Sequence, residues 1–238
     1  MTTALIFAGG TGLRMNSSAK PKQFLELHGK PVILYTLEHF EGHHEIDGII
    51  VVCLESWINE LNHLLRRYEF RKVLKIVPGG NTGQESIYTG LSALEQICGK
   101  DDIVLIHDGV RPLINAELIT ANIAKVKEHG TAITVEAATE SVVSIGEGNF
   151  IKSVPPRAEM FTAKAPQSFR YGLIWDLYQK ARKDNISTID SSHLCSIYNV
   201  EMHIVKSTPN NIKITAPADY YIFRALYEVM ENQQIFGF

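Results

Sequence analysis

Short apolar runs alternate with amphipathic segments along most of the chain. Uninterrupted apolar runs are typical of strands that helices cover on both faces. They predict strands at residues 4–8, 49–54, 73–77, 103–106, 132–135 and 202–205. Apolar residues that recur every three or four positions predict helices at residues 33–40, 57–68, 87–97, 117–128, 174–181 and 218–232. This alternation predicts an α/β fold with a doubly wound, mostly parallel sheet, in which ligands bind beyond the carboxyl ends of the strands.

The pattern changes between Thr139 and Phe169, where short alternating runs flank Gly146-Glu147-Gly148-Asn149. Such runs around a glycine turn are typical of a β-hairpin. We expect a β-arm, inserted at about residues 139–169 of a single domain that spans residues 1–238. Exposed strand edges need a cover, so the arm predicts a homodimer in which another subunit covers it.

Composition limits the possible partners. The 238 residues are 45% hydrophobic and 21% charged, with a net charge of −3, which gives no reason to expect nucleic acid or an anionic membrane as partner. Three widely spaced cysteines without C-x-x-C spacing indicate neither a disulfide framework nor a zinc site, and favour a reducing cytoplasm. No apolar span reaches about 18 residues, so membrane insertion is not expected.

The first predicted strand ends in a glycine turn and a basic segment. Gly9-Gly10-Thr11-Gly12 is followed by Arg14, Lys20 and Lys22. Glycines let backbone N–H groups approach phosphates closely, and the cations can neutralise the charge that gathers there. The order of glycines fits neither the P-loop nor the dinucleotide fingerprint. The segment therefore predicts a nucleoside triphosphate site of another kind.

The run from Ala8 to Met15, followed by Pro21-Lys22-Gln23-Phe24-Leu25, resembles the opening signature of sugar-phosphate nucleotidylyltransferases. Pro-Lys-Gln-Phe is most similar to the cytidylyltransferases that act on 2-C-methyl-D-erythritol 4-phosphate or ribitol 5-phosphate. Further motifs, spread as far as Pro217, extend the resemblance over almost the whole chain. It implies a nucleotide-diphospho-sugar transferase-like Rossmann variant that condenses CTP with an alditol phosphate and releases pyrophosphate, with Mg²⁺ as the metal.

The resemblance also implies roles for individual residues. The CTP site would comprise Phe7, Ala8, Gly9, Gly10, Thr11, Gly12, Gly79, Gly80, Asn81, Gln84, Glu85, Ser86 and Gly109. The catalytic cations would be Arg14, Lys22, Lys213 and Arg157, with Arg157 reaching into the site of the partner subunit. The acceptor would meet Asp108, Arg111, Ser141, Arg157, Asp190 and Lys213, and Asp108 is the candidate metal ligand. A helix N-cap, at Asp190 or Ser191, is the alternative role for this segment.

Departures from the family pattern bear on the acceptor. Gly83 stands where the family usually has arginine in Gly-Gly-x-x-Arg-x-x-Ser, Glu140-Ser141 replaces Asp-Thr, and Ala165 replaces the threonine of Thr-Pro-Gln. The form Pro-x-Arg-x-Glu-Met-aromatic around Arg157 resembles the ribitol phosphate branch and favours D-ribitol 5-phosphate. Three alternatives stay open: 2-C-methyl-D-erythritol 4-phosphate as acceptor, uridylyl or guanylyl transfer, and a nucleotide-binding module without catalysis, which Gly83 would suit.

Overall fold

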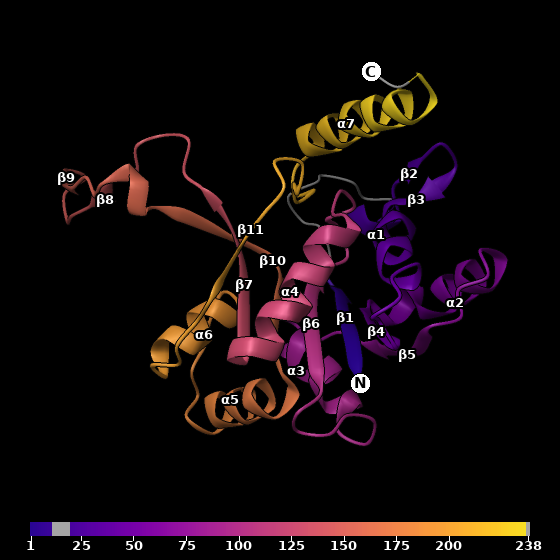
Figure 1. Cartoon of the computed structure of the whole chain (residues 1–238), viewed down its shortest axis with the longest axis horizontal. Coiled ribbons are helices and arrows are strands. Elements are labelled where there is room, and N and C mark those ends of the chain that lie inside the picture. The colour runs from indigo at the N-terminus through magenta and orange to yellow at the C-terminus, as the bar shows by residue number, and fades with distance from the viewer. Residues whose placement is uncertain (11–19, 237–238) are drawn as a thin grey trace.

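The computed structural model of the chain describes residues 1–10 and 20–236 (Figure 1). Within these residues, a seven-stranded sheet has the order β11-β7-β10-β6-β1-β4-β5. Its strands are β1 (Thr2–Ala8), β4 (Gly48–Cys53), β5 (Val73–Pro78), β6 (Ile103–Asp108), β7 (Thr131–Ala137), β10 (Phe161–Arg170) and β11 (Ile204–Lys206). Strand β10 runs antiparallel to both of its neighbours, and the other pairings in this sheet are parallel. The expectation of a mostly parallel sheet is confirmed.

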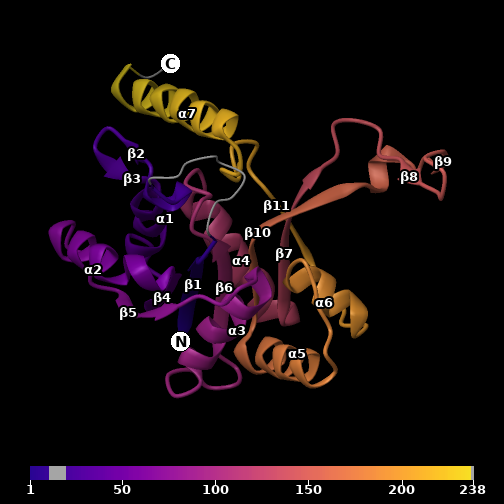
Figure 2. The same cartoon turned by 180° about the vertical axis from the view of Figure 1, so that it is seen from behind.

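Helices cover both faces of the sheet (Figures 1 and 2). Successive side chains of a strand point to opposite faces, so buried apolar side chains lie on both faces of the sheet. Ala4 and Ile6 of β1 pack on one face, against α1 (Val32–Glu41), α2 (Ile58–Arg67) and α4 (Ala116–His129). Leu5 packs on the opposite face, against α3 (Gly83–Leu94), α5 (Tyr171–Lys183) and α6 (Ser191–Ile197). The long helix α7 (Pro217–Phe236) packs through Phe223 on Tyr35 of α1. Among the described residues, no helix has both the length and the apolar character that crossing a membrane requires.

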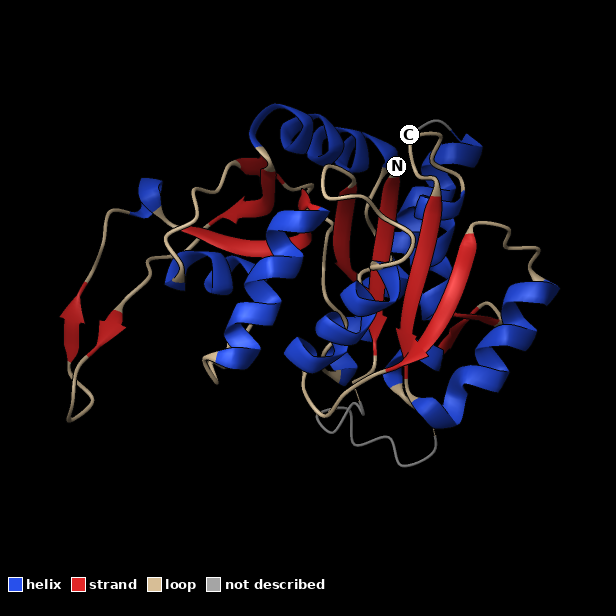
Figure 3. Cartoon of the chain, turned by 90° about the horizontal axis from the view of Figure 1, so that it is seen from below, coloured by secondary structure: helices blue, strands red, loops and turns tan. Residues whose placement is uncertain are grey.

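The predicted hairpin is present as a projecting arm. Strands β8 (Ser144–Ile145) and β9 (Ile151–Ser153) pair antiparallel and lie well away from the central sheet (Figure 3). Gly148 and Asn149 turn the chain between them with φ of +88° and +61°. The return strand reaches further into the body than expected: residues 165–169, assigned to the arm from the sequence, are buried in the central sheet as part of β10.

Two further elements differ from the sequence-based expectation. Helix α3 begins at Gly83, four residues earlier than the predicted start at residue 87, because the Thr82 hydroxyl accepts a hydrogen bond from the Glu85 N–H at 3.1 Å and caps the helix. The apolar pattern did not indicate helix α6; Asp190, considered as a helix N-cap, caps it by accepting from the His193 N–H at 2.8 Å.

Candidate active site

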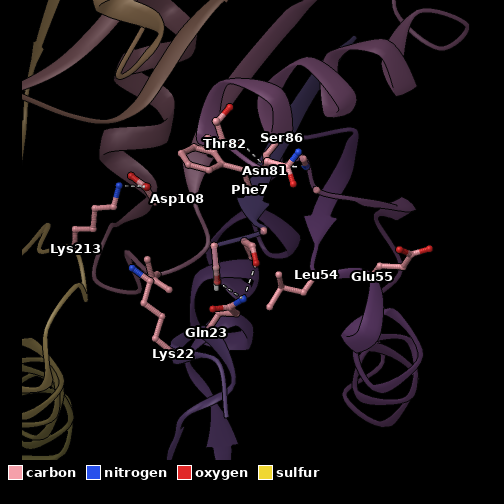
Figure 4. A pocket seen from close by; sticks show the side chains of 17 residues that line it. Phe7, Lys22, Gln23, Leu54, Glu55, Asn81, Thr82, Ser86, Asp108 and Lys213 are labelled. Carbon is pink, nitrogen blue, oxygen red and sulfur yellow. Dashed lines mark hydrogen bonds and ion pairs between the residues drawn. The ribbon is translucent and has the colours of Figure 1, made fainter. Parts of the chain in front are cut away.

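A cavity of about 510 Å³ lies at the carboxyl ends of β1, β4, β5 and β6 (Figure 4). The chain runs outward from β1 to β4 and β5 and then returns to β6 on the other side of β1, so this is the point where the strand order reverses. Ligands of open α/β sheets bind at such a point. The lining residues are Phe7, Ala8, Gly9, Gly10, Lys22, Gln23, Leu54, Glu55, Gly79, Gly80, Asn81, Thr82, Gly83, Ser86, Asp108, Val110 and Lys213.

Two glycine turns form adjoining walls of this cavity and touch each other. A Cβ atom on Gly79 would lie 3.1 Å from the Gly9 Cα, and one on Gly9 would lie 3.0 Å from the Ser86 Oγ. Both separations are tighter than ordinary Cβ contacts, so a side chain at either position would push its neighbours aside. Glycine therefore favours the close approach of the two turns, which exposes backbone to the cavity.

The second turn is fixed by its own hydrogen bonds. The Ser86 hydroxyl accepts from the Gly80 N–H at 3.2 Å and donates to the Thr82 carbonyl at 2.9 Å. The Glu85 carboxylate accepts from the Asn81 N–H at 2.7 Å. The turn leads directly into α3, whose first residue, Gly83, lines the cavity. The partial positive charge at this helix N-terminus suits an anionic ligand.

Two lysines from distant parts of the chain line the same cavity. The Lys22 Nζ donates to the Ile214 carbonyl at 3.0 Å, so the residue after Lys213 holds it in place. The Lys213 Nζ lies 2.5 Å from the Asp108 Oδ1 and 6.0 Å from the centre of the Phe7 ring (Figure 4). Cationic side chains from residues 22 and 213 thus converge on one pocket.

Asp108 is the buried anion of the site. Its Oδ2 accepts from the Arg111 Nε at 2.8 Å, and Arg111 in turn donates to the Asn211 carbonyl at 3.0 Å. Burial by itself raises the pKa of Asp108, but the positive charges of Lys213 and Arg111 outweigh it and lower the pKa to about 2. Asp108 is therefore ionised at neutral pH and holds the Lys213 ammonium at the cavity wall.

His107 supports the Asp108 loop from inside the core. Its side chain is fully buried, and its Nε2 lies 3.2 Å from the Arg111 carbonyl. A carbonyl only accepts, so Nε2 carries the proton and donates. Burial lowers the pKa of His107 to about 3, so the ring is neutral near pH 7. His107 is a hydrogen-bonded support for the loop.

A second cavity, of about 290 Å³, adjoins the first. Both cavities are lined by Phe7, Gly83, Asp108 and Lys213. The second is also lined by Ile87, Ile106, Arg111, Ala163, Lys164, Ala165, Gln167, Ile189, Asp190 and Ser191. Two ligands, one in each cavity, would therefore meet at the Asp108–Lys213 pair.

Most of the predicted site residues line one of these cavities. Those lining the first are Phe7, Ala8, Gly9, Gly10, Lys22, Gly79, Gly80, Asn81, Ser86, Asp108 and Lys213, and the second adds Arg111 and Asp190. Thr11, Gly12 and Arg14 lie outside the described residues.

Other predicted residues lie elsewhere. Gln84 lines neither cavity: its Nε2 donates to the Ile186 carbonyl at 2.9 Å, and its Oε1 accepts from the Thr188 N–H at 2.7 Å. Glu85 braces the turn, and Gly109 lies close to β1, where a Cβ atom on it would be 2.9 Å from the Ala8 Cβ. Ser141 and Arg157 are on the exposed arm, where the Arg157 Nη1 donates to the Thr139 carbonyl at 3.4 Å.

Sequence reasoning missed three residues that shape the cavities. Gln23 is buried and its Nε2 donates to the Ala8 carbonyl at 2.6 Å, which ties the basic segment to the first glycine turn. Thr82 caps α3, and the spacing Thr82-x-x-Glu85 is a helix-start signal that could have revealed it. Lys164 lies in the strand that the hydrophobic pattern did not predict.

Residues 2–228 match the family model described as IspD, 2-C-methyl-D-erythritol 4-phosphate cytidylyltransferase. The chain belongs to this cytidylyltransferase family. It is therefore an enzyme of the nucleotidyltransferase class, as the motifs predict. A ribitol-5-phosphate cytidylyltransferase of Streptococcus agalactiae serotype Ia is 49% identical over 238 residues, with all of both chains covered. One of Vibrio parahaemolyticus has the same identity and coverage.

Family members named for the other acceptor are less similar. A 2-C-methyl-D-erythritol 4-phosphate cytidylyltransferase of Clostridium botulinum is 35% identical, covering 95% of this chain and 97% of its own. The crystal structure of 4-diphosphocytidyl-2C-methyl-D-erythritol synthase from Anaerococcus prevotii superposes with a TM-score of 0.84 at 27% identity, covering 95% of this chain and 96% of that one. The chain is thus consistent with the ribitol phosphate branch of the family.

Proposed function

We propose that the enzyme condenses CTP with D-ribitol 5-phosphate to give CDP-ribitol and pyrophosphate. The observation that carries this proposal is the pair of adjoining cavities that meet at Asp108 and Lys213. The larger cavity, with its glycine walls and Lys22, suits the nucleotide. The smaller one suits the alditol phosphate. The 49% identity to ribitol-5-phosphate cytidylyltransferases supports this acceptor over 2-C-methyl-D-erythritol 4-phosphate, for which the identity is 35%.

The chemistry needs positioning and charge stabilisation rather than a protein nucleophile. An oxygen of the acceptor phosphate attacks the α-phosphorus of CTP, a new P–O bond forms, and the bond to the pyrophosphate leaving group breaks. Lys22 and Lys213 stabilise the negative charge that gathers as the two phosphates approach. The attacking phosphate is already anionic, so no general base is required, and the neutral, buried His107 is not in a position to act as one.

We propose Asp108 as the protein ligand of a divalent metal, which would share the carboxylate with Lys213 and Arg111. Mg²⁺ is commonly held by one or two carboxylates together with substrate phosphates and water. Asp108 supplies one ionised carboxylate between the cavities. Triphosphate oxygens and water would supply the other ligands of the metal. Bound there, Mg²⁺ would shield the charge of the triphosphate.

We further propose a homodimer in which the arm brings Arg157 and Ser141 to the acceptor cavity of the partner subunit. Both residues lie on the exposed arm of their own subunit, and the arm carries several exposed apolar side chains.

The reducing cytoplasm is the expected location, in keeping with three cysteines that are all free thiols. Membership of a cytidylyltransferase family opposes the alternative of a nucleotide-binding module without catalysis, and so do Lys22 and Lys213, which both line the cavity.

The test is pyrophosphate release with CTP, UTP, GTP and ATP, each combined with D-ribitol 5-phosphate or 2-C-methyl-D-erythritol 4-phosphate. We expect the highest kcat/KM for CTP with ribitol 5-phosphate, and loss of turnover when EDTA removes the metal.

Lys22→Ala should lower kcat at least about 100-fold with the fold intact, because it removes a cation that stabilises the transition state. Nucleotide binding without pyrophosphate release would instead support the non-catalytic alternative.

A further inference from the structure

Residues 207–216 join β11 to α7 without helix or strand, and this loop carries Lys213. Two fixed points lie on either side of the lysine. After it, the Ile214 N–H donates to the Val110 carbonyl at 3.0 Å. Before it, Asn211 is only 1% exposed and bonds two other parts of the site. The place of the Lys213 backbone therefore depends on the residues that hold positions 211 and 214.

Asn211 makes these bonds with its backbone and with its side chain. Its carbonyl accepts from the Arg111 Nη1 at 3.0 Å. Its Nδ2 donates to the Ala165 carbonyl at 2.7 Å and to the Ser207 Oγ at 3.0 Å. Ala165 lines the acceptor cavity, and Arg111 pairs with Asp108. One buried residue thus joins the wall of the acceptor cavity to the ion pairs at its junction with the nucleotide cavity.

The Ala165 carbonyl is available for this bond because the register of β10 is irregular there. The pairing of β10 with β7 shifts between Ala163 and Gln167. Ala165 lies in this irregular segment and has no registered partner on either neighbouring strand. A buried carbonyl outside the ladder needs another donor, and the Asn211 amide supplies it.

The other end of the Asn211 amide indicates what fixes its orientation. The Oδ1 is buried and has no hydrogen-bond partner among the described residues. Turning the amide over would place this oxygen against the Ala165 carbonyl, so the bond to Ala165 sets the orientation. A buried oxygen without a partner opposes stability. The asparagine side chain is therefore better explained by the loop that it holds than by a gain in stability.

We propose that Asn211 is a positioning residue for the reaction, whose side chain fixes the loop so that the Lys213 ammonium lies at the junction of the two cavities. This inference rests on the proposed function. The Lys213 side chain is 39% exposed, and its ion pair with Asp108 fixes the ammonium group but not the backbone. Asn211 lines neither cavity, so it acts through Lys213 and not on a substrate. A displacement of about 1 Å in a site can lower turnover roughly 100-fold.

The test is steady-state kinetics of Asn211→Ala, which removes both donors of the amide and keeps the backbone carbonyl for Arg111. We expect kcat per folded enzyme to fall roughly 30-fold, because Lys213 acts in the transition state, while KM for CTP and for D-ribitol 5-phosphate stays within about threefold. An unchanged kcat would overturn the inference.

Asn122→Ala is the matched control. Asn122 is also fully buried, and its Nδ2 donates to a carbonyl, that of Leu118 at 3.0 Å, but within α4 and away from both cavities. With the folded fraction of each variant measured by circular dichroism, we expect kcat per folded Asn122→Ala enzyme to stay within about twofold of wild type. Equal losses in the two variants would mean that Asn211 only supports the fold, and would overturn the inference.

A double-mutant cycle measures whether the effect passes through Lys213. In a Lys213→Met background, assayed with radiolabelled CTP because turnover is slow, Asn211→Ala should lower kcat by less than about threefold. The same roughly 30-fold loss in both backgrounds would mean that Asn211 acts independently of the lysine, and would overturn the inference. If Asn211→Ala does not fold, Asn211→Ser is measured against the same criteria. A wild-type enzyme that releases no pyrophosphate with any alditol phosphate would refute the proposed function itself, which separates the two failures.

Discussion

His107 and Asp108 are adjacent in the chain, yet the structure keeps one neutral and the other charged. The difference lies in the neighbours, since Asp108 has two cations within hydrogen-bond distance and His107 has a backbone carbonyl. Adjacent side chains point to opposite faces of a strand, so His107 enters the core while Asp108 faces the cavities. One dipeptide thus supplies both a support and a charged site residue.

Burial of His107 predicts a pH dependence of stability. The pKa is near 6.5 in the unfolded chain and about 3 in the folded one, so below pH 6.5 the unfolded chain binds a proton that the folded protein does not. The neutral ring makes its full contribution to the free energy of unfolding above pH 6.5, and this contribution falls as the pH falls toward 3. Between pH 7 and pH 5 this one group should lower the free energy of unfolding by about 2 kcal/mol.

Urea denaturation at the two pH values measures the effect. Burial also lowers the pKa of His39 and His43, so the wild type is compared with His107→Gln. Between pH 7 and pH 5, the free energy of unfolding of His107→Gln should fall by about 2 kcal/mol less than that of the wild type. Parallel pH dependences of wild type and His107→Gln would contradict a neutral buried His107.

At the scale of elements, the hydrophobic pattern predicted the parallel strands and the larger helices but not β10 or α6. Strand β10 carries Pro166, Gln167 and Ser168 into the sheet, which hides the apolar pattern of a buried strand. These polar groups are tolerated because partners far along the chain satisfy them. Ser168 donates to the Asn122 Oδ1 at 3.0 Å, and the Gln167 Oε1 accepts from the Ser192 N–H at 2.9 Å. Such pairings cannot be read from the local sequence.

The site residues divide in the same way, into those that the sequence predicted and those that it did not. Glycine turns and lysines that adjoin predicted strands were identified, because strand ends in a parallel sheet share an edge. Lys213 was predicted from a motif, and the structure has it in the loop before α7, where the Ile214 N–H donates to the Val110 carbonyl at 3.0 Å. No local pattern predicted the role of Asn211, because its bond to Ala165 depends on the irregular register of β10.

Helix α6 allows the two roles considered for Asp190 to be separated. The capping role is confirmed, because the Oδ1 accepts from the His193 N–H and from the Ser192 hydroxyl, both at 2.8 Å. Acceptor binding stays a prediction. Asp190→Ala should lower the free energy of unfolding by about 1 kcal/mol, whereas Asp190→Asn keeps an oxygen for the cap and should stay within about 0.5 kcal/mol of wild type.

Asp190→Asn then isolates the charge from the cap. Because the side chain lines the acceptor cavity, we expect this variant to raise the KM for ribitol 5-phosphate roughly fivefold while its stability, measured by urea denaturation, is retained. An unchanged KM would leave Asp190 with the capping role alone.

At the scale of the whole molecule, a single subunit does not explain why the arm exposes apolar side chains. The arm is a two-stranded hairpin. Its apolar side chains Ile145, Phe150, Ile151 and Val154 are between 58% and 65% exposed. Isolated hairpins are marginally stable in water, and exposed apolar patches mark interaction surfaces. A second subunit that covers these side chains would stabilise the arm and carry Arg157 to a site other than its own.

Mixing two inactive variants tests this exchange of arms. Arg157→Ala and Lys213→Ala should each be nearly inactive alone, because each removes a cation from every site. In a mixed dimer with exchanged arms, one site combines the intact Lys213 of one subunit with the intact Arg157 of the other, and the second site lacks both. Random reassembly of equal amounts after mild denaturation should therefore restore roughly a quarter of wild-type activity. If Arg157 instead serves its own subunit, each site of the mixed dimer lacks one cation and the mixture stays inactive, with sedimentation analysis confirming that dimers have formed.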